Sequence, residues 1–318
     1  MRRELHALPA QFLERLRNII PASQWDQVVN TFIAPPPTTF RINSLKTAFP
    51  AVWETLMSAG FRLERVPWYP EAVILRGGRL RDLQETALYT SGAIYVQSLS
   101  SMVPALVLAP QAGDTVLDIT AAPGSKTTQM ACLMRGEGRI VANDNNRVRF
   151  YKLKATVGQQ GAANVTLSRR FGESFARSDP AAFDRVLVDA PCGTEGRFYT
   201  GRASSYDYWT PRKIHEMVVK QRRLLQAGAS ALRPGGVLVY STCTFAPEEN
   251  EGVVSWALNT FRGTLELQPV ALPIANTMPG LTAWEEKVFG EALGLTLRVL
   301  PSDTMEGFFL ARLTKAPS

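Results

Sequence analysis

One pattern repeats between about residue 100 and residue 240: an apolar run, a turn built from small residues, and then a helical segment. The pattern predicts strands at 115–119, 139–143, 164–168, 185–189 and 236–240, with helices at 126–134, 146–157 and 211–232. Strands that alternate with helices in this way form parallel sheets with helices on both faces. We therefore expect an α/β fold built on a doubly wound, Rossmann-like sheet over residues 101–318.

The first 100 residues follow another pattern. Helical spacing over 8–32 is broken by Pro35-Pro36-Pro37, and a strand at 39–43, a helix at 49–59 and strands at 61–66 and 72–75 follow. We interpret residues 1–100 as a small N-terminal α+β module.

Composition narrows the class of protein. Of the 318 residues 45% are hydrophobic and 20% are charged, as in soluble globular proteins, and no apolar run reaches the length of a membrane span. Three distant cysteines and two histidines predict neither a disulfide framework nor a zinc site, and free thiols fit the cytoplasm. We expect a cytoplasmic monomer without a bound metal.

The charge balance points to a polyanionic partner. The net charge is +7 and the isoelectric point is about 9.5. A basic excess of this size favours nucleic acid, although any single basic residue is more simply a solvated surface group.

Four predicted strands deliver polar or reactive groups where they end. These groups are Asp118, Asp144, Asp189 and Cys243. Ligands of doubly wound sheets gather at the carboxyl ends of the strands, so we expect the four side chains to share one rim.

The turn after the first of these strands predicts a cofactor site. Small residues at 121–124 let the backbone approach a ligand, and the following helix N-terminus offers free N–H groups. Thr120 and Ser125 replace both glycines of a P-loop, and G-x-G-x-x-G is absent. Asp144 could bind ribose hydroxyls, or cap the next helix, or do both. A ribose-bearing cofactor without a phosphate cradle indicates S-adenosylmethionine.

Two cysteines also sit at strand ends. Cys192 lies in Asp189-Ala190-Pro191-Cys192 and Cys243 lies in Ser241-Thr242-Cys243-Thr244, whereas Cys132 falls in an apolar helical stretch and is expected in the core. A thiolate can add covalently to an aromatic base at neutral pH. The chemistry alone leaves open which of the two cysteines attacks.

These motifs occur together and in order along nearly the whole chain. With Asp118-Ile119-Thr120-Ala121-Ala122-Pro123-Gly124-Ser125-Lys126-Thr127 and Pro247-Glu248-Glu249-Asn250-Glu251, the chain resembles the Sun/Nop family of RNA cytosine-5 methyltransferases. Weaker matches lie at Arg41-Ile42-Asn43, Tyr95-Val96-Gln97, Trp209-Thr210-Pro211 and Gly307-Phe308-Phe309.

The resemblance implies a cofactor site and an N-terminal module that binds RNA. S-adenosylmethionine would be held by Ala121, Ala122, Pro123, Gly124, Ser125, Lys126 and Thr127, together with Asp144, Arg149 and Asp189. The family usually carries an acid beside the adenine where this chain has Phe171, so Phe171 or Glu173 is a candidate for that contact.

The resemblance also assigns the chemistry. Cys243 would attack C6 of cytosine, Cys192 would assist product release, and Asp189 would contact N3 of the base. Lys126 would be the cation that lowers the pKa of Cys243. The chain departs from the family's usual order after the first cysteine, with Gly193-Thr194 in place of Ser-Gly or Thr-Gly. Ribosomal RNA is favoured over tRNA as the substrate.

Two alternatives stay open: a DNA cytosine-5 methyltransferase with Cys192 as the nucleophile, and a non-catalytic RNA-binding protein. Several side chains also have two interpretations. Phe198, Tyr199, Tyr206, Tyr208 and Trp209 suit either RNA stacking or a loop packed by its own aromatics, and Arg41 and Lys46 are weaker candidates for RNA contact. The acids at 248–251 are explained as favourable first-turn charges of a helix.

Overall fold

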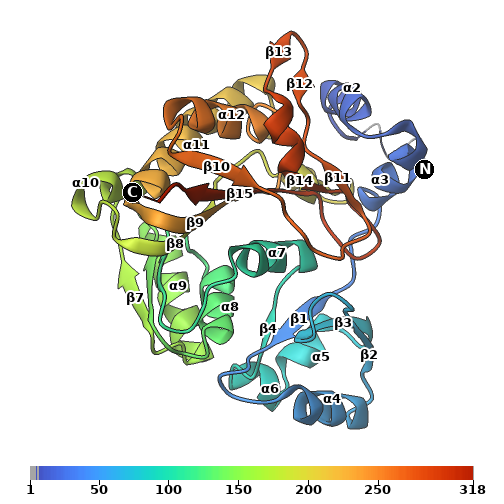
Figure 1. Ribbon diagram of the computed structural model, residues 1–318. Coiled ribbons are helices and arrows are strands. Elements are labelled where there is room, and N and C mark those ends of the chain that lie inside the picture. Colours follow the sequence, from blue (N-terminus) through green and yellow to red (C-terminus); the bar gives the residue numbers. More distant parts are fainter. Residues whose placement is uncertain (1–4, 6, 318) are drawn as a thin grey trace.

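The computed structural model describes residue 5 and residues 7–317 and contains two main sheets (Figure 1). One has four strands in the order β2-β3-β1-β4, and the other has nine strands. A two-stranded hairpin is formed by β12 (Ala283–Trp284) and β13 (Lys287–Val288). No helix in this part of the chain is long and apolar enough to cross a membrane.

The larger sheet contains the parallel strands that the sequence predicts. They pair in the order β9-β8-β5-β6-β7. Their bounds are β5 (Thr115–Asp118), β6 (Arg139–Asn143), β7 (Val165–Ser168), β8 (Phe183–Asp189) and β9 (Leu232–Thr242). The carboxyl ends of β5, β8 and β9 are therefore neighbours.

The C-terminal part adds antiparallel strands to the β9 edge. β15 (Phe308–Lys315) pairs with β9, and beyond it lie β14 (Leu297–Val299), β11 (Thr277–Pro279) and β10 (Leu265–Gln268). The alternation of strands and helices did not predict this extension, because antiparallel strands joined by loops lack the intervening helix that marks a parallel unit. The observed sheet is therefore mixed.

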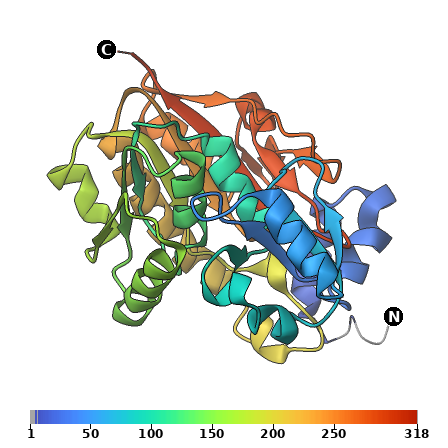
Figure 2. The same ribbon diagram turned by 90° about the horizontal axis from the view of Figure 1, so that it is seen from below.

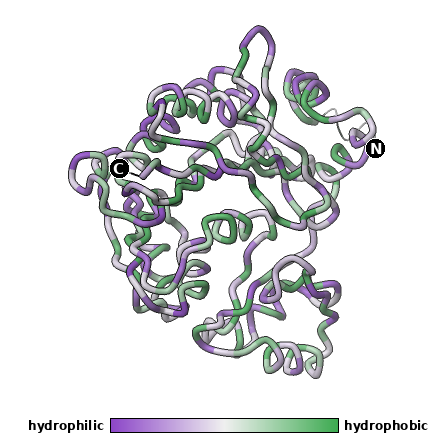
Figure 3. The backbone as a smooth tube through the Cα atoms, viewed as in Figure 1, coloured by the Kyte–Doolittle hydropathy of each residue, from purple (hydrophilic) through white to green (hydrophobic). Residues whose placement is uncertain are grey.

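Helices cover both faces of this sheet, which confirms the doubly wound architecture. One face carries α7 (Leu99–Leu108), α8 (Ser125–Leu133) and α9 (Arg147–Gln160). The other face carries α10 (Phe175–Ser178), α11 (Pro211–Ala231) and α12 (Glu251–Thr260). Helix α7 is buried along almost its whole length and consists mostly of hydrophobic residues (Figure 3), as expected for a helix enclosed by protein.

The small sheet has its own core and is tied to the large one through a buried arginine. It consists of β1 (Thr39–Ile42), β2 (Arg62–Arg65), β3 (Ala72–Gly77) and β4 (Ile94–Val96), with α4 (Phe49–Ser58), α5 (Leu80–Gln84) and α6 (Ala87–Thr90). Arg41 is fully buried and donates to Thr128 Oγ1 at 2.6 Å and to the Ser125 carbonyl at 3.3 Å. The idea that Arg41 contacts RNA is therefore wrong, since its guanidinium is used to hold helix α8.

The N-terminal helices α2 (Ala10–Ile19) and α3 (Trp25–Thr31) pack away from the small sheet. The Phe12 ring lies 4.9 Å from the ring of Phe198 and 5.9 Å from that of Trp209, centroid to centroid. Figure 2 shows these helices beside the segment that carries both aromatics. The described residues up to 100 thus supply a small sheet and a separate helical pair, and the domain boundary at residue 100 stays a prediction.

Candidate active site

A cavity of about 1090 Å³ opens at the carboxyl ends of the parallel strands, and the four strand-end groups line it together. Asp118 ends β5 and Asp189 ends β8, while Asp144 follows β6 and Cys243 follows β9. Lys126, Arg149, Cys192 and the turn residues Ala121, Ala122, Pro123 and Ser125 complete this wall. The two remaining predicted residues, Gly124 and Thr127, stand just behind it.

Gly124 and Thr127 shape the turn between β5 and α8. Gly124 starts the helix with φ of 109°, a conformation that a residue with a Cβ rarely adopts. The Thr127 hydroxyl donates to Asp118 Oδ2 at 2.6 Å. Asp118 Oδ1 is buried and has no partner within the described part of the chain, which leaves one carboxylate oxygen available to a ligand.

Burial raises the pKa of Asp118 to about 7, and the negative charge of Asp189 adds to this effect. A carboxyl with a raised pKa in the folded state costs stability as pH rises from its ordinary value of 3.8 towards 7. We expect Asp118→Asn to raise the free energy of unfolding at pH 8 by about 2–4 kcal/mol.

The increase in the free energy of unfolding caused by Asp118→Asn should be about 2 kcal/mol smaller at pH 5.5 than at pH 8. At pH 5.5 the carboxyl of the parent protein is already protonated in the folded state. Chemical denaturation of the ligand-free protein at both pH values measures this difference. A variant less stable than the parent at pH 8 would contradict this, because it would show that the ionised Asp118 carboxylate stabilises the fold.

Asp144 is buried at the end of β6 and faces the cavity. Its Oδ2 lies 3.2 Å from Arg149 Nη2, and its Oδ1 accepts from the Asn146 amide at 3.0 Å. Asn146, not Asp144, caps α9, since its side chain accepts from the Arg149 amide. Arg149 also donates to the Ala122 carbonyl at 2.8 Å, which joins Asp144 to the turn after β5.

Asp189 is held by two side chains, one on each carboxylate oxygen. Lys126 Nζ donates to its Oδ2 at 2.7 Å, and Ser241 Oγ donates to its Oδ1 at 2.8 Å. Lys126 also donates to Ser101 Oγ at 2.9 Å. The lysine therefore pairs with the aspartate and fixes its carboxylate at the cavity wall.

The two strand-end cysteines are adjacent. Their sulfur atoms are 3.5 Å apart, and the Cys243 amide donates to Cys192 Sγ at 3.4 Å. Both cysteines are free thiols that are partly exposed in the cavity, whereas Cys132 is buried as expected. Cys243 lines the same cavity as the turn after β5, as expected if the strand-end groups share one rim.

The thiols differ in acidity. The hydrogen bond from Cys192 lowers the pKa of Cys243, and the positive charge of Arg197 lowers it further. The same bond, together with burial, raises the pKa of Cys192. Arg197 was not singled out as this cation from the sequence; the resemblance suggested Lys126, which instead pairs with Asp189. The sequence did contain a signal for this role, since Arg197 is a cation in the loop that follows Cys192.

The structure separates the aromatics after Cys192 into two groups. Phe198 and Trp209 belong to the core formed with the N-terminal helices, and Trp209 Nε1 donates to Glu195 Oε1 at 2.7 Å. For these two residues RNA stacking is therefore wrong. Tyr208 stays 43% exposed, and Phe171, 70% exposed, lines the cavity together with Glu173.

The acids after Cys243 do more than complement a helix dipole, although Glu251 does lie in the first turn of α12 as predicted. Glu249 and Glu251 are fully buried. Glu251 forms a two-pronged ion pair with Arg298, at 2.6 Å for each bond. Glu249 precedes α12 and bonds to the backbone of the Cys192 loop. Several acids directly after a reactive cysteine are the sequence signal that could have indicated buried, bonded carboxyl groups here.

Comparison with known proteins identifies relatives over nearly the whole chain. Residues 105–314 match the family model described as 16S rRNA methyltransferase RsmB/F, and residues 8–99 match that of the N-terminal domain of 16S rRNA methyltransferase RsmF. A protein of Serratia proteamaculans named ribosomal RNA small subunit methyltransferase F is 37% identical over 316 residues. A protein of the same name from Escherichia coli O81 is 36% identical over 314 residues.

The chain spans 63% of the length of each of these two relatives, while 97% and 96% of the chain itself is matched. Among solved structures, a methyltransferase homolog protein from Pyrococcus horikoshii aligns with a TM-score of 0.80 and 31% identity, over 97% of this chain and all of the other. These matches confirm the family resemblance and the fold. The chain belongs to the RsmB/F family of 16S rRNA methyltransferases.

Proposed function

We propose that this chain transfers a methyl group from S-adenosylmethionine to C5 of a cytosine in small-subunit ribosomal RNA. The observation that carries the proposal is the pair of thiols, 3.5 Å apart, in the same cavity as the turn after β5 and the carboxylate of Asp189. The names of the relatives favour ribosomal RNA over tRNA. We further propose that the chain acts as a cytoplasmic monomer.

The residues of the cavity fit the cofactor. The unpartnered Asp118 Oδ1 suits an ammonium group, and the buried Asp144 carboxylate keeps acceptor capacity for ribose hydroxyls. The cavity of about 1090 Å³ has room for a nucleoside and a second planar base. When bound, S-adenosylmethionine supplies the electrophilic methyl group.

The side chains then divide the work on the cytosine ring. The Cys243 thiolate forms a bond to C6, and the displaced electron pair makes C5 nucleophilic enough to take the methyl group. Lys126 and Ser241 hold Asp189 so that its carboxyl can contact N3 of the base. Positioned acid–base groups of this kind contribute about 10²–10⁴-fold.

Cys192 completes the reaction after methyl transfer. Once Cys243 is bonded to carbon, it no longer carries the charge that raises the pKa of Cys192. Cys192, which is partly exposed, can then lose its own proton to solvent and take up the C5 proton, after which the C5–C6 double bond re-forms and the Cys243 thiolate leaves. Cys192 thus lowers the pKa of Cys243 before the attack and accepts the C5 proton after methyl transfer, and both roles depend on its position beside Cys243.

An RNA partner is supported by basic side chains at the mouth of the cavity. Lys152, Lys220 and Arg223 line it, are exposed, and form no ion pair within the described residues. Such groups suit phosphate contacts. We also propose that residues 1–100 contribute to RNA binding.

Incubation with methyl-labelled S-adenosylmethionine and small-subunit ribosomal RNA tests the proposal. We expect label in 5-methylcytosine, identified by nucleoside mass spectrometry, and bisulfite sequencing of RNA from cells with and without the gene should then locate the nucleotide. Label appearing in DNA would support the DNA enzyme, and binding of RNA without any transfer would support the non-catalytic alternative.

A further inference from the structure

Two buried carboxyl groups lie behind the two cysteine loops. Glu195, in the loop after Cys192, is 2% exposed, and Glu249, after Cys243, is fully buried. Neither forms an ion pair within residues 5 and 7–317. Buried acids are costly unless their oxygens are hydrogen-bonded, so the partners of these two acids indicate what they do.

Glu249 bonds to the Cys192 loop. Its two oxygens accept from the Gly193 amide at 3.2 and 3.0 Å, and its Oε2 accepts from Gln221 Nε2 at 2.6 Å. The same Gln221 nitrogen donates to the Pro191 carbonyl at 2.9 Å. Glu249 and Gln221 thus form hydrogen bonds to the backbone immediately after and before Cys192.

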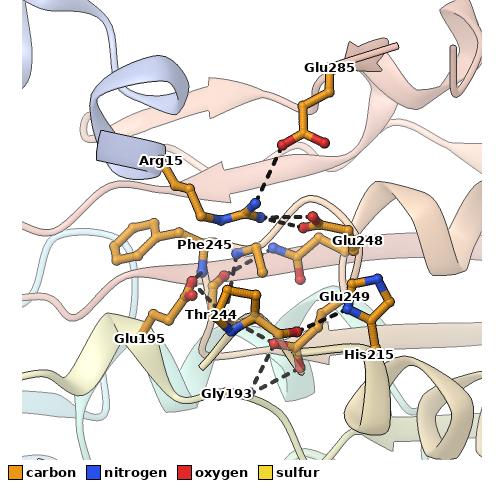
Figure 4. Close-up of polar contacts among 12 residues, drawn as sticks. Arg15, Gly193, Glu195, His215, Thr244, Phe245, Glu248, Glu249 and Glu285 are labelled. Carbon is orange, nitrogen blue, oxygen red and sulfur yellow. Dashed lines mark hydrogen bonds and ion pairs between the residues drawn. The ribbon is translucent and has the colours of Figure 1, made fainter. Parts of the chain in front are cut away.

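Glu195 makes the reciprocal contacts to the Cys243 loop (Figure 4). Its Oε2 accepts from the Thr244 hydroxyl at 2.8 Å and from the Phe245 amide at 2.9 Å. Each loop therefore carries the carboxyl that holds the other loop. The Gly196 amide adds a direct bond to the Cys243 carbonyl at 2.9 Å.

The position of Glu249 leaves no room for a side chain at residue 193. A Cβ at that position would lie 2.8 Å from Glu249 Oε1, closer than real Cβ contacts allow. The order Cys192-Gly193-Thr194, which departs from the family's usual order, is thus matched to the position of Glu249 in this chain.

We propose that Glu249 and Glu195 are positioning residues whose reciprocal bonds hold the Cys192 thiol within hydrogen-bond distance of the Cys243 sulfur. The inference rests on the proposed function for its biological purpose, but the thiol pair itself can be measured without RNA or cofactor. Neither carboxyl lines the cavity, so they act through the two loops and not on the substrate.

Glu249 offers a substitution that matches its shape. Burial, and then the charge of Glu195, raise the pKa of Glu249 well above its ordinary value. Glutamine keeps the length of the side chain and an oxygen that can accept from both Gly193 and Gln221. Methionine keeps the approximate volume and removes both acceptors.

The test is the rate at which iodoacetamide alkylates Cys243 across a pH series, read from the mass of the peptide that contains it. We expect Glu249→Gln to keep the parent profile. Glu249→Met should alkylate at least about tenfold more slowly at pH 7 and move its inflection to higher pH, since a hydrogen bond to a charged group is worth about an order of magnitude.

Glu248→Gln is the matched control, because Glu248 is the adjacent acid and bonds to Arg15 instead of either cysteine loop (Figure 4). It should alkylate like the parent. If Glu249→Met does not fold, Gln221→Met removes the donor that joins Glu249 to Pro191 and should shift the profile in the same direction.

A parent-like profile in a folded Glu249→Met or Gln221→Met variant would overturn the inference, as would an equal loss in Glu249→Gln. Failure of the proposed function would look different. The alkylation profile would still shift while no methyl group reached RNA in the parent protein.

Discussion

Replacement of Cys243 by alanine is expected to abolish methyl transfer, with a fall in kcat of about four orders of magnitude or more. Loss of a covalent nucleophile removes the reaction path itself, so effects of this size are typical. The fold should survive, because the Cys243 thiol is partly exposed in the cavity and, among residues 5 and 7–317, hydrogen-bonds to Cys192 alone. Single-turnover transfer of labelled methyl groups to ribosomal RNA measures the change.

Cys132→Ala is the matched control for this experiment. It removes the same atoms from a buried cysteine, whose sulfur contacts Asn43 Oδ1 at 3.3 Å and lies outside the cavity lining. Its methyl transfer should stay within a few-fold of the parent. If Cys243→Ala kept substantial activity while Cys192→Ala lost it, the attacking residue would be Cys192 and the DNA-type assignment would hold.

Replacement of Cys192 by alanine is expected to trap the RNA on the protein. The variant loses the thiol that normally helps release the product, so the bond between Cys243 and C6 persists after methylation. It also loses the hydrogen bond that lowers the pKa of Cys243, so the adduct should form more slowly than in the parent. A protease-sensitive band of retarded RNA on a denaturing gel reports the adduct.

The double variant with alanine at both cysteines controls for non-covalent retention and should give no such band. Absence of the band in Cys192→Ala, under conditions where the parent methylates RNA, would contradict the division of labour between the two thiols. A band that required Cys192 and not Cys243 would reverse it.

Sequence reasoning located the site because of how parallel strands are arranged. The alternation of strands and helices placed Asp118, Asp144, Asp189 and Cys243 at strand ends, and a parallel sheet brings such ends to one rim. The distance between Cys192 and Cys243 follows from the pairing of β8 with β9, which the order of strands along the chain does not give.

Partners within the site could not be read from the sequence, because they depend on loops that cross each other. The charge of Arg197 acts on Cys243, whereas Lys126 pairs with Asp189, although in the sequence both are simply cations near a motif. Glu249 was explained by the helix dipole, a local rule that does not indicate which distant groups a buried carboxyl binds. Phe198 and Trp209 pack against Phe12, which is distant in sequence, and a local pattern cannot predict such a contact.

The most direct test of the account is to identify which sulfur bonds to the pyrimidine. RNA that carries 5-fluorocytidine at the target position cannot lose a proton from C5, so the adduct formed after methyl transfer is stable. Digestion and mass spectrometry of the trapped complex should place the nucleotide on the peptide containing Cys243. Finding it on the peptide containing Cys192, or finding no adduct while ordinary RNA is methylated, would contradict the central claim.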